Sequence, residues 1–560
     1  MSADSVQPIH CAAALGAVAL AYYLLPYLHD PHEYRRRFSG PLLASLSGWW
    51  MSYTCLTKDQ NEHIKQLHHK YGTFVRIGPN HISISDPDAM EAVYAHGSGL
   101  LKSDFYGGAP GQASNTFAEL DKSKHLKLRK RIANIFSQQN VLTFQPRVKK
   151  HIAQLCAQLD LRCREAARGV SGFNWTAHNG SAVMDVCPQL SYLAFDIIGD
   201  LSAGASFGLI QAQKDSSPIV GSSDETGQKD QGAVQISVIA AMASFNTLIV
   251  AVQMFPLWSR NIVKLLPWYF PGFMKQIRFF GLVASLIEAR LKRGSNEEDG
   301  PDFIDKFLQA KNEDGTGMTE DELRSETTVM LLAGSDTSSN TLSSLFYHLA
   351  IHPDMQRKLQ SELDEHLPPV QSEDNDDKSG IAVPPSDIVP DYNDIKNLPY
   401  LNACIKEVLR VHSTIGTGLP RIVPEGKTLT VAGQTFKAGS VISVPSYVTN
   451  RSDVWGPDAS EFRPERWLDE NAGSVNKYFV PFSTGPRSCV GRNLAYMNLA
   501  LITAGLLRRY SIEALPTTKV VYLVLRLRLK QANVVCEQLT VHGTFVREAA
   551  HCEVAIKRRD

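Results

Sequence analysis

Two long stretches of the chain place apolar residues at the helical period of about 3.6 residues. One runs from Thr319 to about Ala350 without a proline, and Thr319 followed by Glu322 has the capping-box pattern that starts a helix. At about 1.5 Å per residue, this helix is roughly 45 Å long. The second stretch, Asn493 to Leu506, has the same spacing. The pattern therefore predicts one long helix in the middle of the chain and another near its C-terminus.

The N-terminus begins with a different pattern, a continuous apolar run. Cys11 to Leu28 carries no charge, and as a helix it is roughly 27 Å long, about the thickness of a bilayer core. Asp4 precedes the run, whereas Arg35 and its two basic neighbours follow it. This charge bias predicts a single transmembrane anchor with the rest of the chain in the cytosol. A cleaved signal peptide is the alternative, with Ala19-Leu20-Ala21 as its cleavage site.

A further apolar stretch, Val234 to Trp258, is interrupted by polar residues, among them Gln235, Ser237, Ser244, Asn246 and Gln253. This favours a buried or membrane-dipping helix pair over a second membrane span. Two polar stretches, Lys214–Gly232 and Ser372–Tyr392, are rich in Gly, Ser, Asp and Pro and are expected to be surface loops.

Composition narrows the class of protein. The 560 residues are 43% hydrophobic and carry a formal net charge of zero, which argues against a nucleic-acid-binding protein. Nine cysteines are scattered without paired spacing, so a disulfide framework is not expected and a reducing compartment is favoured.

The segment from Phe482 to Gly491 carries the strongest chemical signal. Cys489 lies between Gly485 and Gly491, with Arg487 two residues before it. A thiolate is the metal-binding form of cysteine, and backbone N–H groups and the start of a following helix stabilise it. Gly485 can adopt a backbone conformation closed to other residues, Gly491 leaves space for a flat ring, and Arg487 is placed to meet an anionic group on that ring. A buried structural cysteine is the alternative interpretation.

The middle of the predicted central helix reads Ala333-Gly334-Ser335-Asp336-Thr337. Glycine inside a helix costs about 1 kcal/mol relative to alanine, which suggests a specific reason for it. The following acid and hydroxyl indicate a local widening that admits a ligand beside two proton-handling groups. An ordinary Ser/Thr-rich helix, whose hydroxyls bond back to the preceding turn, is the alternative.

These segments resemble the cytochrome P450 family. The stretch from Phe482 to Gly491 matches its haem loop at every fixed position, and Gly334 to Thr337 matches its oxygen-activation helix. The resemblance implies a mainly α-helical fold with a smaller β region and haem b (iron protoporphyrin IX) as cofactor. It further implies that Cys489 is the axial iron ligand. In that family Thr337 would hydrogen-bond dioxygen, and Asp336 would help to relay protons.

The same resemblance assigns roles to residues elsewhere in the chain. His125 and Arg129 stand where many family members place a propionate-binding Trp and Arg, and Arg421 is a further propionate candidate. Three other residues match a buried structural network of the family: Glu407, Arg410 and Arg466.

The expected domain division is a membrane anchor at residues 1–30 and a catalytic domain at residues 31–560. The expected location is the endoplasmic reticulum membrane, with the catalytic domain in the cytosol. Because the chain has no flavin or nicotinamide motif, electrons are expected from NADPH through a separate reductase. That reductase would dock near Lys127, Lys130 and Arg131. The alternatives are a reductase-independent isomerase or dehydratase and a non-catalytic haem sensor.

The substrate is the least defined expectation. The sequence also resembles fungal benzoate 4-monooxygenase-like enzymes, for example at Lys102-Ser103-Asp104-Phe105-Tyr106 and from His412 to Arg421. Yet the loop Phe105–Leu120, expected to line the pocket, contains no Arg or Lys to pair with a buried carboxylate. A neutral phenol or aromatic polyketide intermediate of fungal secondary metabolism is therefore expected, and benzoate is the alternative. Val520–Cys536 has no place in the family pattern.

Overall fold

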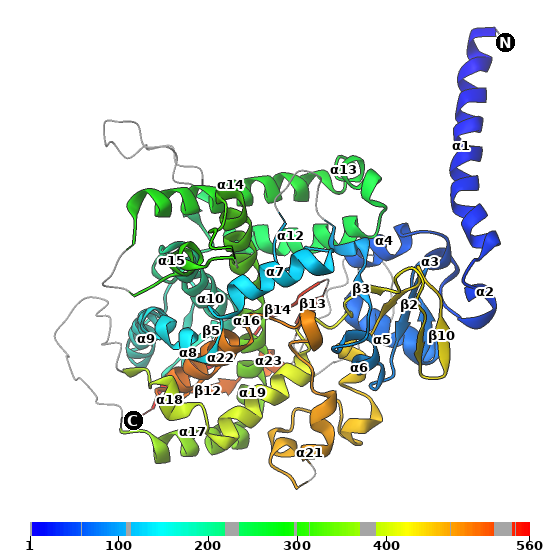
Figure 1. The fold of residues 1–560 in the computed structure, drawn as a ribbon. Helices are drawn as coiled ribbons and strands as arrows, with labels where there is room; N and C mark the ends of the chain where they lie inside the picture. Colours follow the sequence, from blue (N-terminus) through cyan, green and yellow to red (C-terminus); the bar gives the residue numbers. More distant parts are fainter. Residues whose placement is uncertain are drawn as a thin grey trace.

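The computed structural model describes residues 3–57, 59–107, 114–218, 235–295, 300–312, 314–369, 388–470, 472–519, 540–543 and 545–559. The expected loops Lys214–Gly232 and Ser372–Tyr392 lie largely outside these residues, and Val520–Cys536 lies entirely outside them. A large helical part occupies one side of the molecule in Figure 1, and a smaller part with short strands occupies the other.

The helical core is built from α9 (Gln145–Ala167), α10 (Val186–Ala203), α16 (Glu320–Ile351) and α22 (Arg492–Leu507). The predicted capping box begins α16: Thr319 Oγ1 accepts from the Glu322 N–H at 3.2 Å, and a Glu322 carboxylate oxygen accepts from the Thr319 N–H at 3.0 Å. Both long helices predicted from the sequence are therefore confirmed.

The other α-helices lie outside this core, some of them beside the smaller part with short strands (Figure 1). They are α1 (Ala3–His29), α2 (Tyr34–Arg37), α3 (Leu42–Leu46), α4 (Trp49–Thr57), α5 (Gln60–Tyr71), α6 (Ala89–Tyr94), α7 (Lys122–Ala133), α8 (Gln138–Val141), α11 (Leu209–Ala212), α12 (Val238–Gln253), α13 (Arg260–Val263), α14 (Phe270–Arg293), α15 (Phe303–Gln309), α17 (Pro353–His366), α18 (Tyr392–Ile395), α19 (Pro399–His412), α20 (Ser446–Thr449), α21 (Ala472–Val475) and α23 (Pro516–Lys519).

Two larger sheets complete the fold. The first has the order β1-β2-β11-β8-β3, formed by Phe74–Arg76, His81–Ile84, Val441–Ser443, Arg421–Ile422 and Leu101–Lys102. The second has the order β12-β15-β5-β4, formed by Tyr510–Ala514, Glu553–Arg558, Ser181–Asp185 and Thr176–His178. Three two-stranded pairs are β6 (Ser217–Pro218) with β7 (Gln235–Ile236), β9 (Leu429–Val431) with β10 (Gln434–Phe436), and β13 (Thr540–Gly543) with β14 (Arg547–His551).

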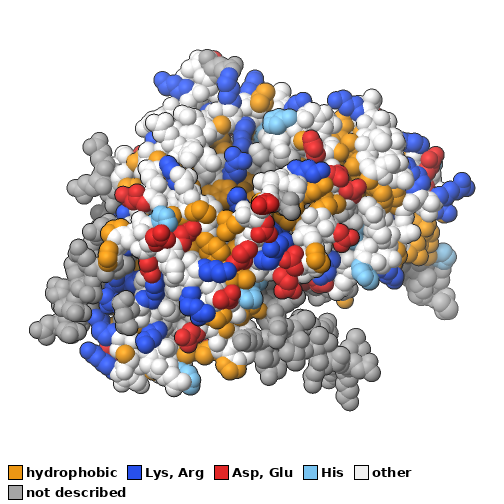
Figure 2. All heavy atoms as spheres, turned by 90° about the horizontal axis from the view of Figure 1, so that it is seen from below, with side chains coloured by type: hydrophobic (Ala, Val, Ile, Leu, Met, Phe, Trp, Pro, Cys, Tyr) orange, Lys and Arg blue, Asp and Glu red, His pale blue; other side chains and the backbone are white. Residues whose placement is uncertain are grey.

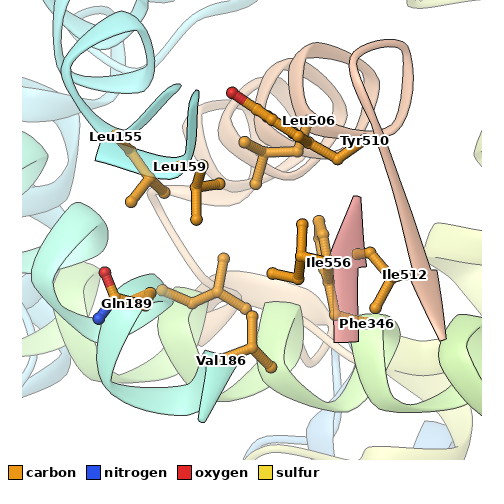
Figure 3. Close-up of a pocket in the computed structure, with 10 residues that line it drawn as sticks. Leu155, Leu159, Val186, Gln189, Phe346, Leu506, Tyr510, Ile512 and Ile556 are labelled. Carbon is orange, nitrogen blue, oxygen red and sulfur yellow. The ribbon is translucent and has the colours of Figure 1, made fainter. Parts of the chain in front are cut away.

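The second sheet packs on the helical core through apolar side chains. A void of only about 10 Å³ remains where they meet, which is about the volume of one water molecule (Figure 3). It is lined by Leu155, Leu159, Val186, Gln189, Leu190, Phe346, Leu506, Tyr510, Ile512 and Ile556. This junction is therefore closely packed, and it is not a ligand site.

Helix α1 projects away from the body of the protein (Figure 1) and exposes Val18, Leu20, Leu25 and Leu28. The expected segment is thus helical. However, none of the helices that the structure describes combines the length and the apolar character that crossing a bilayer requires. The expectation of a transmembrane helix is therefore not supported by the structure.

Within the second apolar stretch, Val238–Gln253 forms one helix, α12, rather than the expected pair; it packs against α4 and α14 and is largely buried. Exposed apolar side chains follow it on the surface: Leu257, Trp258, Ile262, Leu265, Trp268 and Phe270. On the face of the molecule shown in Figure 2, basic and acidic side chains are interspersed, in keeping with the net charge of zero.

Candidate active site

A cavity of about 280 Å³ lies between α16 and the loop that leads into α22. Thr337 of α16 and Cys489 of the loop both line it, as do Gly334, Phe482 and Gly491. The structure therefore brings the two strongest sequence motifs, which are far apart in the chain, to one site.

The loop holds Cys489 at the start of α22. The Cys489 N–H donates to the Phe482 carbonyl oxygen at 2.9 Å, and the Ser488 N–H donates to the Gly485 carbonyl oxygen at 3.1 Å. The Phe482 ring packs on Tyr496 of α22, with ring centroids 5.2 Å apart. These contacts fix the loop against the helix and turn the Cys489 side chain toward the cavity.

The two glycines of the loop have different reasons for being there. Gly485 has φ of +72°, and a Cβ atom on it would stand 2.2 Å from the Tyr94 carbonyl oxygen, so no other residue fits without strain. Gly491 has ordinary backbone angles, and a Cβ atom on it would meet only open space. Gly485 is thus required by the fold, whereas Gly491 keeps the cavity open.

A group of cations gathers at one end of the cavity: Lys102 and Arg487 line it, and the buried Arg421 lies beside them without lining it. The Lys102 ammonium donates to the Phe117 carbonyl oxygen and lies 4.1 Å from the centroid of the Tyr106 ring. The Arg487 guanidinium donates to the Glu119 carbonyl oxygen at 2.6 Å, and Arg421 donates to the Tyr106 hydroxyl at 3.3 Å. In the described part of the chain, no carboxylate forms an ion pair with Lys102, Arg421 or Arg487.

The positive charges lie close enough to one another to lower the pKa values of these groups. Burial, then Arg421 and Arg487, lowers the pKa of Lys102. Burial and Arg421 lower the pKa of Arg487 to about 10. Burial and the nearby cations lower the pKa of His125 to about 3, so its imidazole is neutral and can still donate one N–H. Such a cluster is costly unless an anion binds it.

This cluster fits the haem that the sequence resemblance implies. A buried, positively charged end is suited to the two propionates of haem, and the open space beside Gly491 is suited to a flat ring. Lys102 also belongs to the cluster, and this was not predicted, because nothing in the sequence shows that β3 brings its side chain to the cavity.

Arg129 lies between the cations and the cysteine. Its guanidinium donates to the Ser488 carbonyl oxygen at 2.9 Å. In the protein alone, burial raises the pKa of the Cys489 thiol, and the Gly491 amide, Arg129 and Arg492 oppose that shift. These three groups would favour the thiolate once a metal binds it.

On the other side of the cavity, α16 continues as a regular helix through Gly334. A Cβ atom on Gly334 would stand 2.5 Å from Cδ1 of Ile198, so the glycine allows α10 to approach α16 closely. The expected local widening is therefore not seen, and helix packing explains the glycine. The Thr337 hydroxyl faces the cavity and donates to the Ala333 carbonyl oxygen at 2.7 Å, as in the ordinary-helix alternative.

Asp336 is buried within the helical core. Asn340, one turn later, donates to Asp336 Oδ1 at 2.8 Å, and Asn246 of α12 donates to Oδ2 at 2.5 Å. Burial raises the pKa of the Asp336 carboxyl group, and the two amides only partly oppose this. Asn246 was not predicted, because nothing in the sequence indicates which face of α12 meets α16.

The expected structural network is present, fully buried, beneath the site. Glu407 accepts from Arg410 at 2.8 and 3.0 Å and from Arg466 Nε at 2.9 Å. The indole N–H of Trp467 also donates to Glu407, at 2.9 Å. The network joins α19 to the irregular segment that precedes the cysteine loop.

The basic residues of α7 do not all face solvent. Lys127 and Lys130 are exposed, as expected for a docking surface. Arg131 is buried instead, and it forms an ion pair with Glu322 of α16 at 3.0 Å. Its assignment to the reductase-docking surface was therefore wrong, because the helix turns that side chain inward.

Comparisons with known proteins agree with this geometry. The cytochrome P450 family model matches residues 40–527. Benzoate 4-monooxygenase bphA of Aspergillus niger is 33% identical over 508 residues, which cover 89% of this chain and 91% of that protein. Pisatin demethylase of Fusarium vanettenii is 28% identical over 508 residues, with 88% of each chain covered. The chain therefore belongs to the cytochrome P450 family and is a cytochrome P450 monooxygenase.

Proposed function

We propose that this enzyme hydroxylates a small, neutral aromatic substrate, of the phenolic or polyketide-derived kind found in fungal secondary metabolism. The observation that supports this most is the character of the cavity around Thr337. The side chains that line it there are apolar or carry hydroxyl groups: Ile198, Val329, Met330, Ala333, Ser338, Thr341, Thr414, Ile415 and Phe545. Such a surface accepts an apolar ring and offers hydroxyls to a phenol.

A second candidate, benzoate, is favoured by one specific observation. Lys102 places an ammonium group in the cavity beside Phe117, where it can pair with a substrate carboxylate. A relative named benzoate 4-monooxygenase supports the same candidate. Because Lys102 lies with Arg421 and Arg487, we assign it instead to the haem propionates.

The residues of the site have distinct tasks in this proposal. Haem, bound through Cys489, supplies the oxygen-activating chemistry that no side chain offers. Lys102, Arg421, Arg487, His125 and Arg129 would hold its propionates. Thr337 presents a hydroxyl to the cavity, and Asp336 behind it stores and returns a proton.

Electrons would come from NADPH through a separate reductase that docks on α7, where Lys127 and Lys130 are exposed. We place the enzyme at the endoplasmic reticulum membrane, facing the cytosol. The exposed Trp258 and Trp268 support contact with a lipid surface, and Tyr22 of α1 packs against Trp258 with ring centroids 6.5 Å apart.

Benzoate and methyl benzoate form a matched pair of probes, since they share the ring and differ in charge. We expect methyl benzoate to shift the Soret band of the haem-loaded enzyme at lower concentration and to give a reductase-dependent hydroxylated product. Tighter binding of benzoate, lost in Lys102→Met with haem content unchanged, would establish the second candidate. No response to either probe or to phenol, from enzyme with full haem content, would refute a small aromatic substrate.

A further inference from the structure

A buried acid of α16 holds the short segment at residues 115–118 that borders the cavity. The Glu326 atom Oε1 accepts from the backbone N–H of Thr116 and from the Thr116 hydroxyl, both at 2.7 Å. Beside this pair, the Asn115 amide donates to the Ser325 hydroxyl at 3.2 Å. Glu326 is fully buried, and Thr116 is buried as well. The segment is therefore docked onto two consecutive residues of α16.

The segment itself is a compact turn. The side-chain oxygen of Asn115 accepts from the backbone N–H groups of Phe117 and Ala118 at 3.1 and 2.9 Å. Because the turn is closed by its own side chain, a bond to Thr116 also places the residue that follows it. On its other side, the Lys102 ammonium of β3 donates to the Phe117 carbonyl oxygen and lies 4.3 Å from the centroid of the Phe117 ring. Phe117 is thus held between α16 and β3.

The Phe117 ring forms part of the cavity wall. It lines the cavity and 42% of its surface is accessible, so a ligand in the cavity can cover it. Two aromatic rings meet it edge to face, each at 77°: Tyr106, with centroids 5.6 Å apart, and Phe545, with centroids 6.2 Å apart. Phe545 lines the cavity too. Burial of apolar surface and ring stacking therefore both favour an aromatic ligand at this wall.

The bonds from Thr116 to Glu326 satisfy a donor that has no alternative. In the described part of the chain, the buried Thr116 N–H has no backbone acceptor, and a buried N–H without a partner is costly. The second oxygen of Glu326, Oε2, is buried and accepts no hydrogen bond from the described residues. One oxygen therefore carries both bonds, and an amide oxygen can replace it.

We propose that Glu326 is a positioning residue for substrate binding. By holding Thr116, it keeps the Phe117 ring beside Phe545 at the cavity wall, where the two rings select for an aromatic ligand. Glu326 is not among the residues that line the cavity, so it acts through the segment that it holds. The inference deepens the proposed function and rests on it for the class of ligand alone.

The test uses two ligands of the ferric haem iron, imidazole and 4-phenylimidazole, which differ by one phenyl ring. Each shifts the Soret band when its nitrogen binds the iron, so the ratio of their Kd values measures what the phenyl ring gains from the cavity wall. We expect Phe117→Leu and Glu326→Leu each to weaken 4-phenylimidazole roughly tenfold and imidazole less than about twofold. The double variant should be no weaker than either single variant, because both changes remove the same contact.

The controls separate positioning from general damage to the helix. Glu326→Gln keeps an oxygen acceptor and should retain the wild-type ratio. Thr327→Val is the matched control, because Thr327 is the next residue of α16, is buried, and has a hydroxyl without a hydrogen-bond partner among the described residues. If Glu326→Leu gives no haem-loaded protein, Thr116→Val carries the test. It removes the hydroxyl bond alone and should weaken 4-phenylimidazole several-fold, whereas Thr116→Ser should keep the wild-type ratio.

Three results would overturn the proposal: an unchanged ratio in Glu326→Leu or in the Thr116→Val variant that replaces it, equal weakening of both ligands, or an additive loss in the double variant. These measurements need no turnover. A wild type and variants that give the expected ratios, with no hydroxylation of methyl benzoate, benzoate or phenol, would therefore refute the proposed function and support the role of Glu326.

Discussion

Arg466 Nε donates to Glu407 Oε1 at 2.9 Å, although the two residues are 59 positions apart in the chain. Glu407 is wholly buried, and Arg410 shares the same carboxylate at 2.8 Å. Two arginines therefore share one acid inside the protein, and Asp458, at 3.3 Å, is a further partner of Arg466 only. The loop that carries Cys489 follows shortly after Arg466. The hydrogen bond between Arg466 and Glu407 therefore helps to hold the segment that leads into the haem site.

Removing the charge of Glu407 should strongly destabilise the protein. In Glu407→Gln, Arg410 loses its counter-charge while it remains buried and Arg466 keeps only Asp458, which costs about 3–5 kcal/mol. We expect little folded, haem-loaded protein on expression, measured as haem per polypeptide. Arg463→Met is the matched control in the same segment, because its ion pairs with Asp458 and Asp469 are partly exposed and contribute at most about 1 kcal/mol. Equal haem content in Glu407→Gln and wild type would contradict the structural role.

The Thr337 hydroxyl should determine how much product is formed for each NADPH consumed. Thr337→Ala removes the hydroxyl that faces the cavity, and we expect normal haem binding with more peroxide and less product per NADPH consumed. Ser335→Ala is the control, since its buried hydroxyl bonds to the Leu331 carbonyl oxygen at 3.0 Å on the same helix. If both variants kept the wild-type ratio of product to NADPH, Thr337 would have no part in oxygen activation.

Alanine substitutions at the two glycines of the cysteine loop should have different effects: one should lower stability and the other should lower haem content. Gly485→Ala forces a side chain into a positive φ and against the Tyr94 carbonyl oxygen, so the haem-free protein should lose about 1–3 kcal/mol of stability or more. Gly491→Ala adds a methyl group to open space, so the haem-free protein should lose less than about 1 kcal/mol. Its haem content should nevertheless fall. Normal haem content in Gly491→Ala would show that the ring does not lie against this residue.

Charge on the exposed face of α7 should control the encounter with the reductase. Lys127→Glu and Lys130→Glu should raise the KM for the reductase and weaken the dependence of turnover on salt, with haem content unchanged. Lys427→Glu, an exposed site outside α7, serves as control. Arg131→Gln should instead lower thermal stability, because it breaks the buried pair with Glu322. An unchanged KM in both α7 lysine variants would place the docking surface elsewhere.

Local sequence signals predicted the parts of the site that lie within one segment. The capping box at Thr319 predicted the start of α16, and the pattern from Phe482 to Gly491 predicted a cysteine just before the N-terminus of a helix. Such signals depend on neighbouring residues, and the chain itself keeps these together. The resemblance added the order of the motifs and hence the P450 fold.

Contacts between distant segments could not be predicted in this way. Asn246 reaches Asp336 from α12, and Lys102 reaches the cavity from β3, and their placement depends on how those elements pack. Arg131 looked like one more exposed cation of a basic helix, yet its position on the helix turns it toward Glu322. A contact between two helices also explains Gly334, because Ile198 of α10 occupies the space that a side chain at this position would need.

The most direct test of the account is the carbon-monoxide difference spectrum of the dithionite-reduced protein, recorded for wild type and Cys489→Ser. We expect a thiolate-type Soret band in wild type and its loss in the variant, since Cys489 is the cysteine that lines the cavity. A histidine-like band, or a folded wild type that binds no haem, would contradict the assignment of Cys489 as the iron ligand and the proposals that depend on it.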